Sequence, residues 1–410
     1  MSDLDDPAVA HPLDENPERR SAAYRAMRAQ GSVVPFPGLE NILAAVTYQT
    51  VSTGLSAVED FGGSAGQESL PEEDKIIAAI AEPRHGKVRK IINSVVAFHK
   101  SQKIEPYLQE LIAGLVDNLV AEAGAAGPSG ADLVAHLAQP IPPAAIARLL
   151  GFPESDAPEF TRWIHESGRA FEQAAASGQS LAIADSNTEM RDHVDARIAE
   201  RLALPPEEWP MDALSRFLNT EVEGERLDPR SIRAQIMFII GAGTDTTRNA
   251  IGNLFYRLGS DPQAYAALRA DPSLVDSAVE EALRMDAPAQ FMVRTCRRET
   301  ELGDRRVEPG QTVFMCIGAA NRDESVHDDP DTFRVDRGSR EHLAFGSGRH
   351  ICPGAGLARM EIRIALRTFM SRVVRFHLAD PTFHAMPVAM LLGPRALHIV
   401  IDEQTPAHVG

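Results

Sequence analysis

The sequence predicts a mainly α-helical protein with a minor β region. Most of the 410-residue chain shows apolar residues at the spacing of amphipathic helices. The longest helix is expected to begin at Asp228-Pro229, an N-cap followed by proline at the first helical position, and to end near Gly259. Strand-like pieces are short and bounded by glycine or proline, and they lie at Ser32 to Pro35, Thr312 to Cys316 and Ala396 to Ile401.

The composition indicates a sizeable acidic protein. The chain is 44% hydrophobic and 24% charged, which is enough to bury a large core. Its 58 acidic side chains and 41 lysines and arginines give a net charge of −17, which disfavours nucleic acid as a partner. Three cysteines at irregular spacing favour a reducing compartment, the cytoplasm. The start lacks the pattern of a signal peptide, and the best apolar run, Ile236 to Ile240, is too short to span a membrane.

The stretch from Phe345 to Arg359 is the most informative part of the chain. It is a glycine-rich loop that presents one cysteine, Cys352, and runs into an amphipathic helix. Glycine lets the backbone approach a flat ligand closely, and a helix N-terminus favours a thiolate. One soft ligand cannot build a zinc or iron–sulfur site, but it can serve as the single axial ligand of haem. Taken alone, a lone cysteine is more often a buried structural thiol.

The whole pattern, Phe345-Gly-x-Gly-x-His-x-Cys-x-Gly-x-x-Leu-Ala-Arg, resembles the haem-binding signature of the cytochrome P-450 family, in its soluble bacterial class. The resemblance implies a triangular helical prism that holds haem b between a central helix and the helix after the cysteine. It implies that Cys352 ligates the iron and that Phe345, Gly346 and Gly354 contact the haem. We therefore expect a single domain over residues 1–410 with no fused redox module. Pro353 departs from the commonest pattern, because proline has no N–H to donate to the sulfur.

A second motif lies inside the predicted long helix, which contains Ala242-Gly-Thr-Asp-Thr-Thr247. Glycine in mid-helix costs about 1 kcal/mol relative to alanine, and a threonine hydroxyl can bond back to a carbonyl and bend the helix. The run resembles the family's oxygen-binding groove. This implies that Ala242 lies against the haem and that Asp245 and Thr246 are the acid–alcohol pair that delivers protons. Alone, the same run suits an N-cap cluster that starts a second helix.

A third motif, Glu281-Ala-Leu-Arg284, places a carboxylate and a guanidinium on one helical face. Such pairs commonly decorate solvated helices and contribute only a few tenths of a kcal/mol. In the family they are joined by a second arginine before the cysteine loop, and Phe333-x-x-x-Arg337 fits that place. Glu281, Arg284 and Arg337 are therefore expected to support folding and the haem loop, not catalysis.

Haem carries two propionates, so its pocket needs cations and hydrogen-bond donors from separate parts of the chain. Four residues stand at the family's places. His85 and Arg89 lie one turn apart on a predicted helix, Arg294 follows the Glu–Arg helix, and His350 precedes the cysteine. Each one alone is more often a surface residue or a hydrogen-bonded core histidine.

The resemblance implies a monooxygenase that uses O2 and two electrons to hydroxylate, or otherwise oxidise, a hydrophobic small molecule. The electrons would come from a ferredoxin or flavodoxin with its NAD(P)H-dependent reductase. A basic cluster, opposed locally by Glu82 and Glu105, consists of Arg84, Lys87, Arg89, Lys90, Lys100 and Lys103. Its members Arg84, Lys87 and Lys90 are expected to steer that acidic partner, although charge clusters are usually just solvated faces. Neither a membrane nor nucleic acid is expected as a partner, and the protein is expected to be a monomer.

The same motifs bear on whether the protein has another activity of the family. A peroxide-driven relative would usually replace Asp245 and Thr246, and a non-catalytic relative would be expected to lack Cys352. Dealkylation, ring coupling and desaturation stay open. By analogy with the family, the substrate is expected to contact the central helix, the segment before Arg294 and a C-terminal loop. The residues at these places are Phe238, Ala242, Gln290, Phe291, Met292, Met390 and Leu391. The apolar residues at these places suit terpenoid, aromatic, fatty acid and steroid substrates equally.

Overall fold

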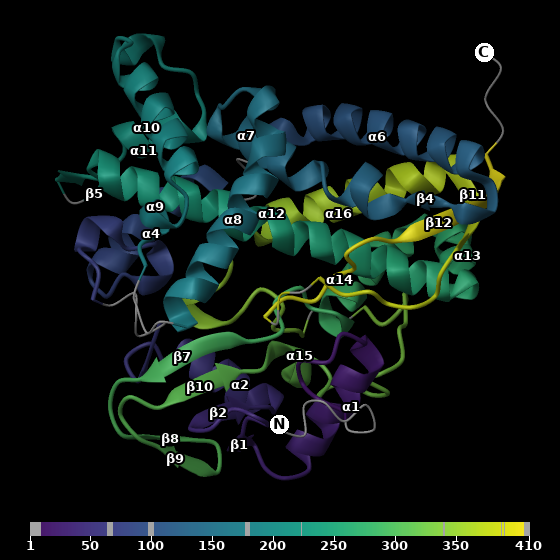
Figure 1. The fold of residues 1–410 in the computed structure, drawn as a ribbon, viewed down its shortest axis with the longest axis horizontal. Coiled ribbons are helices and arrows are strands. Elements are labelled where there is room, and N and C mark those ends of the chain that lie inside the picture. Colours follow the sequence, from purple (N-terminus) through teal and green to yellow (C-terminus); the bar gives the residue numbers. More distant parts are fainter. Residues whose placement is uncertain are drawn as a thin grey trace.

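The computed structural model describes residues 10–63, 69–96, 102–176, 181–222, 224–338, 341–386, 388 and 390–405. Helices make up the larger part of the fold, and a five-stranded sheet lies in the smaller part (Figure 1). The prediction of a mainly α protein with a minor β region is confirmed. Within the described ranges, no helix is both long enough and apolar enough to cross a membrane.

The central helix, α12, extends over Pro229–Ser260. Its N-cap residue, Asp228, accepts a hydrogen bond from the Ser231 N–H at 3.0 Å, which explains why the helix begins where the sequence predicts. The hydroxyls of Thr244 and Thr246 each donate at 2.8 Å to the carbonyl of the residue four positions earlier. The helix is continuous through this run, so the alternative of a second helix starting there is wrong.

Helices from most of the chain cover α12. Those that contact it include α7 (Ile141–Leu150), α8 (Ala157–Ala176), α9 (Ile183–Ser186), α10 (Thr188–Leu202), α11 (Ala213–Asn219), α13 (Pro262–Ala270), α14 (Val275–Met285) and α16 (Ala355–Arg372). Two further helices, α4 (Arg84–Val96) and α6 (Glu105–Ala126), pack on α11 and on α16 respectively. A single π-helical turn occupies Val134–Ala138. The core of this part includes Phe255, Phe369 and Phe376, whose rings meet edge to face.

The main sheet has the strand order β1 (Val33–Pro35), β2 (Ile42–Ala45), β10 (Thr312–Met315), β7 (Met292–Cys296) and β3 (Phe61–Gly62). Strand β10 is parallel to β2 and antiparallel to β7. Apolar side chains on one side form a cluster with α1 (Pro17–Arg28), and those on the other side pack with α2 (Tyr48–Ser56). Both faces of the sheet are therefore covered.

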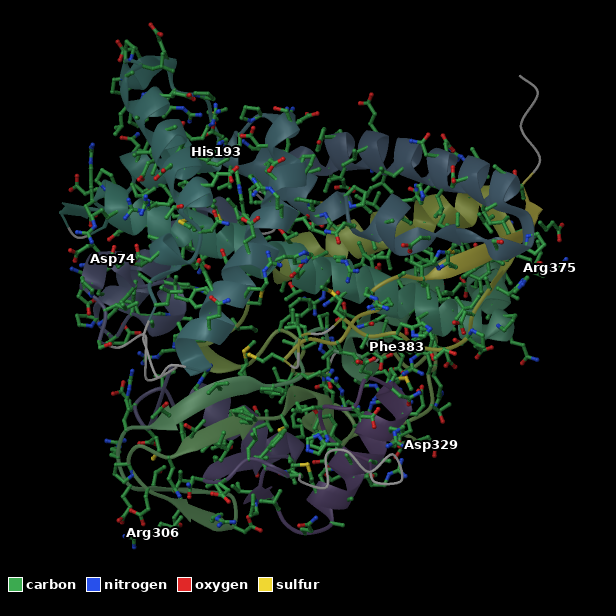
Figure 2. All side chains as sticks on the ribbon, viewed as in Figure 1. Asp74, His193, Arg306, Asp329, Arg375 and Phe383 are labelled. Carbon is green, nitrogen blue, oxygen red and sulfur yellow. The ribbon has the colours of Figure 1, made fainter. Side chains whose placement is uncertain are left out.

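The remaining strands are peripheral. They are β4 (Ala131–Asp132), β11 (Val373–Leu378) and β12 (His398–Gln404) in one sheet, and the pairs β5 (Glu221–Val222) with β6 (Glu225–Arg226) and β8 (Thr300–Leu302) with β9 (Arg305–Val307). The strands predicted from the sequence correspond to β1, β10 and β12. Figure 2 shows Arg306 on β9 of the β8–β9 hairpin and Arg375 on β11 at the far end of the molecule.

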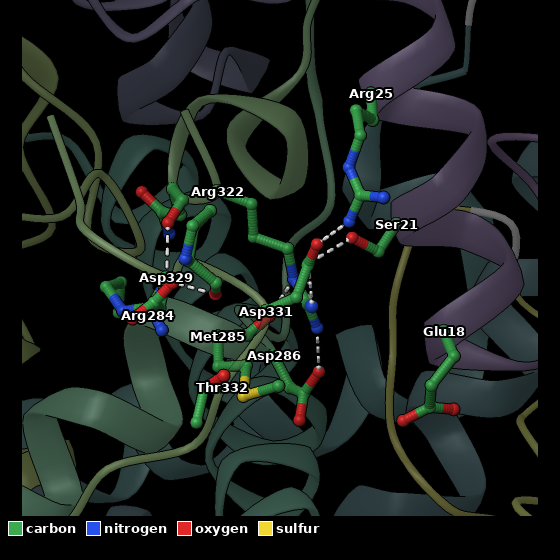
Figure 3. A network of polar contacts seen from close by, with 12 residues as sticks. Glu18, Ser21, Arg25, Arg284, Met285, Asp286, Arg322, Asp329, Asp331 and Thr332 are labelled. Carbon is green, nitrogen blue, oxygen red and sulfur yellow. Dashed lines mark hydrogen bonds and ion pairs between the residues drawn. The ribbon is translucent and has the colours of Figure 1, made fainter. Parts of the chain in front are cut away.

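A buried polar network joins the helical part to the sheet-containing part (Figure 3). Arg322, which follows the short helix α15 (Ile317–Ala320), donates at 2.8 Å to Asp331, at 3.0 Å to Asp286 and at 3.0 Å to the Met285 carbonyl. Asp331 also accepts a hydrogen bond from Ser21 on α1 at 2.5 Å. The network therefore fixes α1 and the segment after α15 to the end of α14.

Candidate active site

Cys352 lies in a loop whose backbone is held tightly. Its N–H donates to the Phe345 carbonyl at 2.8 Å. Gly346 and Gly348 have φ angles of +77° and +69°, which residues with a Cβ rarely adopt. A Cβ on Gly348 would lie 2.8 Å from the Cα of Ser56 at the end of α2. Glycine is needed here because the loop turns sharply against another element.

The Cys352 thiol is the accessible one among the cysteines, since Cys296 and Cys316 are buried. Protein atoms on its inner side raise the pKa of the Cys352 thiol, while the backbone N–H groups of Gly354 and Ala355 and the charges of Arg89 and Arg359 lower it. Pro353 supplies no N–H. The first turn of α16 therefore provides the donors that face the sulfur, as expected for a thiolate at a helix N-terminus.

The four predicted propionate ligands come together beside this loop. The rings of His85 and His350 lie with centroids 4.4 Å apart, and Arg89 donates to the Ile351 carbonyl. His85, His350 and Arg294 line a cavity of about 120 Å³ that also contains the side chains of two further arginines. The Nε2 atom of His85 is buried without a hydrogen-bond partner.

Five basic side chains outnumber the two carboxylates of this cavity, Glu59 and Glu82, and Glu82 pairs with His85 and Arg349. Burial, His85 and the nearby arginines lower the pKa of His350 to about 4. Burial also lowers the pKa of Arg294, whose guanidinium donates to the Val293 carbonyl at 3.0 Å and meets no carboxylate that the structure describes. Such a cluster, with an unpartnered histidine nitrogen and more basic than acidic side chains, is suited to binding carboxylate groups.

The acid–alcohol run lies on the inner part of α12. Ala242 is exposed and Thr246 is half-buried, whereas Asp245 is only 6% exposed. Burial raises the pKa of Asp245, and the neighbouring His165 and Arg248 act in the opposite direction. Asp245 Oδ1 is buried without a hydrogen-bond partner. The site thus combines an accessible thiol, a cationic cavity and a buried acid beside a hydroxyl.

Comparison with known proteins identifies the family. The family model described as cytochrome P450 matches residues 53–382. The chain is a cytochrome P450. It is 31% identical over 350 residues to "Putative cytochrome P450 YjiB" of Bacillus subtilis, covering 85% of this chain and 86% of that protein. It is also 29% identical over 391 residues to the steroid C26-monooxygenase of Mycobacterium tuberculosis, covering 94% of each.

Solved P450 structures share the whole fold. A mutant of P450 EryK in complex with erythromycin B superposes with a TM-score of 0.82 at 28% identity, covering 97% of this chain and 100% of that one. The chain therefore has the P450 fold and is a P450 monooxygenase, a haem-iron enzyme.

The residues present fit a haem. The unpartnered Nε2 of His85 and the uncompensated charge of Arg294 suit its propionates, and the exposed Cys352 suits its iron. The exposed face of Ala242 lets a flat ring approach α12, because a side chain larger than a methyl group is absent there. These observations come from separate elements and agree with one ligand.

The Glu–Arg pair forms a buried triad in this P450. Arg284 donates to both Glu281 oxygens, at 2.7 and 2.9 Å, and Arg337 donates to Glu281 at 2.9 Å. Arg284 also donates to the carbonyls of Asn321 and Pro330, at 2.8 and 3.0 Å. The carboxylate and Arg284 are at most 1% exposed, so the pair does not decorate a solvated surface. Its position supports the structural role predicted for it.

A second ion cluster was missed by the sequence reasoning. Glu280 on α14 accepts from Arg359 at 2.6 and 2.8 Å and pairs with His342 at 3.0 Å. The Arg359 guanidinium lies 4.4 Å from the centre of the Phe345 ring. Glu280 therefore holds residues on both sides of Cys352. Two consecutive glutamates, Glu280 and Glu281, stand in the sequence, but only Glu281 belongs to the Glu-x-x-Arg motif. The adjacent Glu280 could therefore have been considered as a second buried acid.

Two predicted substrate contacts need correction. Phe291 stacks on Phe314 at 4.5 Å inside the cluster between the sheet and α1, so it does not line a substrate pocket. Gln290 is 2% exposed, and its side-chain amide is engaged by the Ala287 carbonyl and the Tyr24 hydroxyl. Successive side chains of an extended segment point to opposite faces. The sequence did not reveal which of these residues face the core and which face the substrate side.

The other predicted contacts are accessible. Phe238, Met292 and Leu391 are half-buried, while Ala242 and Met390 are exposed. Leu391 forms an isolated bridge with Ala289, which brings the C-terminal loop beside the segment before β7. Their contact with substrate remains a prediction.

Proposed function

We propose that this P450 is a single-domain monomer that binds haem b through Cys352 and oxidises a hydrophobic small molecule, by hydroxylation or by a related reaction such as dealkylation. Haem, when bound, supplies the activation of O2 and the transfer of one oxygen atom to the substrate. The observation that carries this proposal is the exposed Cys352, two residues after His350 of the arginine-lined cavity, with Asp245 and Thr246 on the helix against which α16 packs.

The cysteine loop and the cationic cluster bind and orient the cofactor. The N–H groups of Gly354 and Ala355 stabilise negative charge on the Cys352 sulfur. His85 and Arg294 would hold the propionates, and Arg89 braces the loop through the Ile351 carbonyl. These groups already stand in place, so the side chains need little rearrangement when haem binds.

Asp245 and Thr246 hold and move protons. Burial raises the pKa of Asp245 and so favours its protonated form relative to an exposed aspartate. The Thr246 hydroxyl donates to the Ala242 carbonyl at 2.8 Å, and rotation about χ1 can redirect it toward the cofactor side. Burial of Asp245 limits its contact with bulk water, whereas the half-buried Thr246 stays accessible.

Thr246→Ala tests this assignment. The variant should consume NAD(P)H while forming about tenfold less product per NAD(P)H, because the hydroxyl that positions the proton is gone. Thr244→Ala is the matched control, since Thr244 makes the same back-bond on the same helix but is fully buried. Product and peroxide are measured against NAD(P)H consumed. Tight coupling in Thr246→Ala would contradict the role.

The redox partner is proposed to be a ferredoxin or flavodoxin with its NAD(P)H-dependent reductase. Helix α4 carries Arg84, Lys87 and Lys90, and it lies against the cysteine loop through Arg89. Electrons delivered at this face have a short path to a cofactor bound at Cys352. The acidic partner would meet a basic patch on an otherwise acidic protein.

The substrate class is proposed from the accessible apolar residues. Phe238, Ala242, Met292 and Leu391 offer a hydrophobic lining without a charged group. Two relatives have names or titles that refer to a steroid and to erythromycin B. An optical titration of the ferric protein with steroids, macrolides, terpenoids, aromatics and fatty acids tests this directly. A low-spin to high-spin Soret shift with one class identifies it, whereas shifts only with charged polar compounds would contradict a hydrophobic substrate.

A further inference from the structure

His165 on α8 faces the proposed proton-delivery acid. Its Nε2 atom lies 3.8 Å from Asp245 Oδ1. Both atoms are buried, and neither has a hydrogen-bond partner. A hydrogen bond needs about 2.7–3.2 Å, so a small side-chain rotation would join two atoms whose bonding capacity is unused. Catalytic hydrogen bonds are often this long before the ligand is bound.

The rest of the His165 ring is accessible. The side chain is 41% exposed, whereas that of Asp245 is 9% exposed. Imidazole has two nitrogens, and a proton accepted at one can be matched by a proton released from the other. His165 therefore stands between a buried carboxyl group and the accessible space beside it.

No other charged group is placed to do this among the described residues that act on Asp245. Arg248 is the second such group, but its guanidinium donates to Gln139 at 2.8 Å, to Asn249 at 2.6 Å and to the Arg395 carbonyl at 3.0 Å. An arginine also does not release its proton.

The acids near His165 are already paired. Glu166, its neighbour on α8, accepts from Arg162 at 3.0 Å and from Asn187, the N-cap of α10, at 2.7 Å. Arg162 also bonds to Glu189 on α10 at 2.5 Å. These bonds fix the turn of α8 that carries His165, and they leave Asp245 as its carboxylate partner.

We propose that His165 is a positioning residue that binds the Asp245 carboxyl group and exchanges protons with it. After Asp245 has given up its proton, a hydronium ion from the solvent gives a proton to Nδ1 and leaves as water, and the proton on Nε2 passes to the ionised Asp245 Oδ1. The carboxyl group becomes neutral, the ring returns to the neutral state as the other tautomer, and no electrons move. The inference rests on the proposed role of Asp245 and extends it to a histidine that no sequence motif marks.

Infrared titration of the haem-loaded protein tests the pair without turnover. The carboxyl C=O band that is lost in Asp245→Asn identifies Asp245. In His165→Gln and His165→Phe this band should persist to higher pH, because His165 acts to lower the pKa of Asp245 and that effect is removed. His193→Gln is the matched control, since His193 pairs with Asp156 at 2.8 Å and packs against Trp163 of α8 instead of Asp245. An unchanged titration in both His165 variants would overturn the proposal.

Kinetics separate proton exchange from a purely structural contact. Glutamine can keep a hydrogen bond to Asp245 but cannot pass protons, so His165→Gln should lower product per NAD(P)H about tenfold and raise the solvent isotope effect, with substrate affinity retained. A change in substrate affinity alone, with coupling retained, would mean that His165 only contacts substrate and would overturn the proposal. Full coupling in Asp245→Asn would instead contradict the proposed role of Asp245, so the two failures are distinguishable.

Discussion

Single residues around Cys352 set the character of the proposed thiolate. Gly354 and Ala355 present N–H groups to the sulfur, whereas Pro353 has none. A thiolate with fewer donors keeps more negative charge and favours the oxidised iron. The sequence was sufficient to find this residue because proline removes a donor wherever it stands.

Pro353→Leu should therefore raise the haem reduction potential. The added N–H would stabilise the thiolate charge by about 0.5–1.5 kcal/mol, the net value of one hydrogen bond, which corresponds to a shift on the order of 20–60 mV in a one-electron couple. Spectroelectrochemical titration measures it. Ile351→Leu is the control, because Ile351 is 49% exposed and the substitution leaves the backbone N–H in place. An unchanged or lower reduction potential in Pro353→Leu would contradict a role for the missing N–H in setting the thiolate charge.

Buried ion pairs between side chains join pairs of elements, and sequence motifs reveal only some of these ion pairs. The Glu281–Arg284 pair was found from its spacing, but its burial and its bonds to Asn321 and Pro330 depend on residues distant in the chain. The Glu280–Arg359 contact joins α14 to α16 and matched no motif. Likewise the parallel pairing of β2 with β10 joins residues about 270 positions apart, which periodicity cannot show.

Arg284→Ala should destabilise the fold by about 3–5 kcal/mol, because it leaves the Glu281 carboxylate buried and uncompensated. Haem loading should fall with it, since Arg337 and the segment before the cysteine loop bond to the same carboxylate. Urea unfolding and the haem-to-protein absorbance ratio measure the two effects. Arg375→Ala, at an arginine that is 63% exposed, should cost less than about 0.5 kcal/mol. Equal effects of the two substitutions would refute the account.

Glu280 should give the junction of α14 and α16 a pH-dependent stability. Burial alone would raise its pKa, but hydrogen bonds from His342 and Arg359 hold the pKa at about 2, below the ordinary 4.5. A depressed carboxyl pKa contributes stability that is present above pH 4.5 and is lost as the pH falls toward 2. After allowance for screening, we expect about 2 kcal/mol at pH 6.

Unfolding of wild type and Glu280→Gln at a series of pH values checks this. The difference in free energy of unfolding should shrink as the pH falls from 5 to 3. A constant difference over that range would show that the Glu280 charge contributes nothing. Asp380→Asn, in an exposed pair with His384, should show a much smaller trend because solvent screens it.

At the scale of the whole molecule, the proposed redox partner and the proposed substrate would contact different elements. The protein has a net charge of −17, yet α4 carries a basic cluster beside the cysteine loop. Fold class, central helix and cysteine loop could be predicted because local patterns and one long motif define them. The orientation of Phe291 and the approach of His165 to Asp245 could not, because packing between distant segments decides them.

Charge reversal on α4 should slow electron delivery. Lys87→Glu and Lys90→Glu should each lower the rate of reduction by an acidic ferredoxin, and the wild-type rate should fall as salt is added, because both effects weaken long-range attraction. Stopped-flow reduction under carbon monoxide measures the rate. Arg375→Glu makes the same change of charge at the far end of the molecule (Figure 2) and should have little effect. Rates that depend neither on salt nor on these lysines would exclude steering by α4.

The central claim is that Cys352 is the thiolate ligand of the haem iron. The most direct measurement is the absorption spectrum of the reduced protein with carbon monoxide, for wild type and for Cys352→Ser loaded with haem. The account predicts the red-shifted Soret band that gives the family its name in wild type, and its loss in Cys352→Ser. The same band in both proteins would show that another residue ligates the iron, and would contradict the site described here.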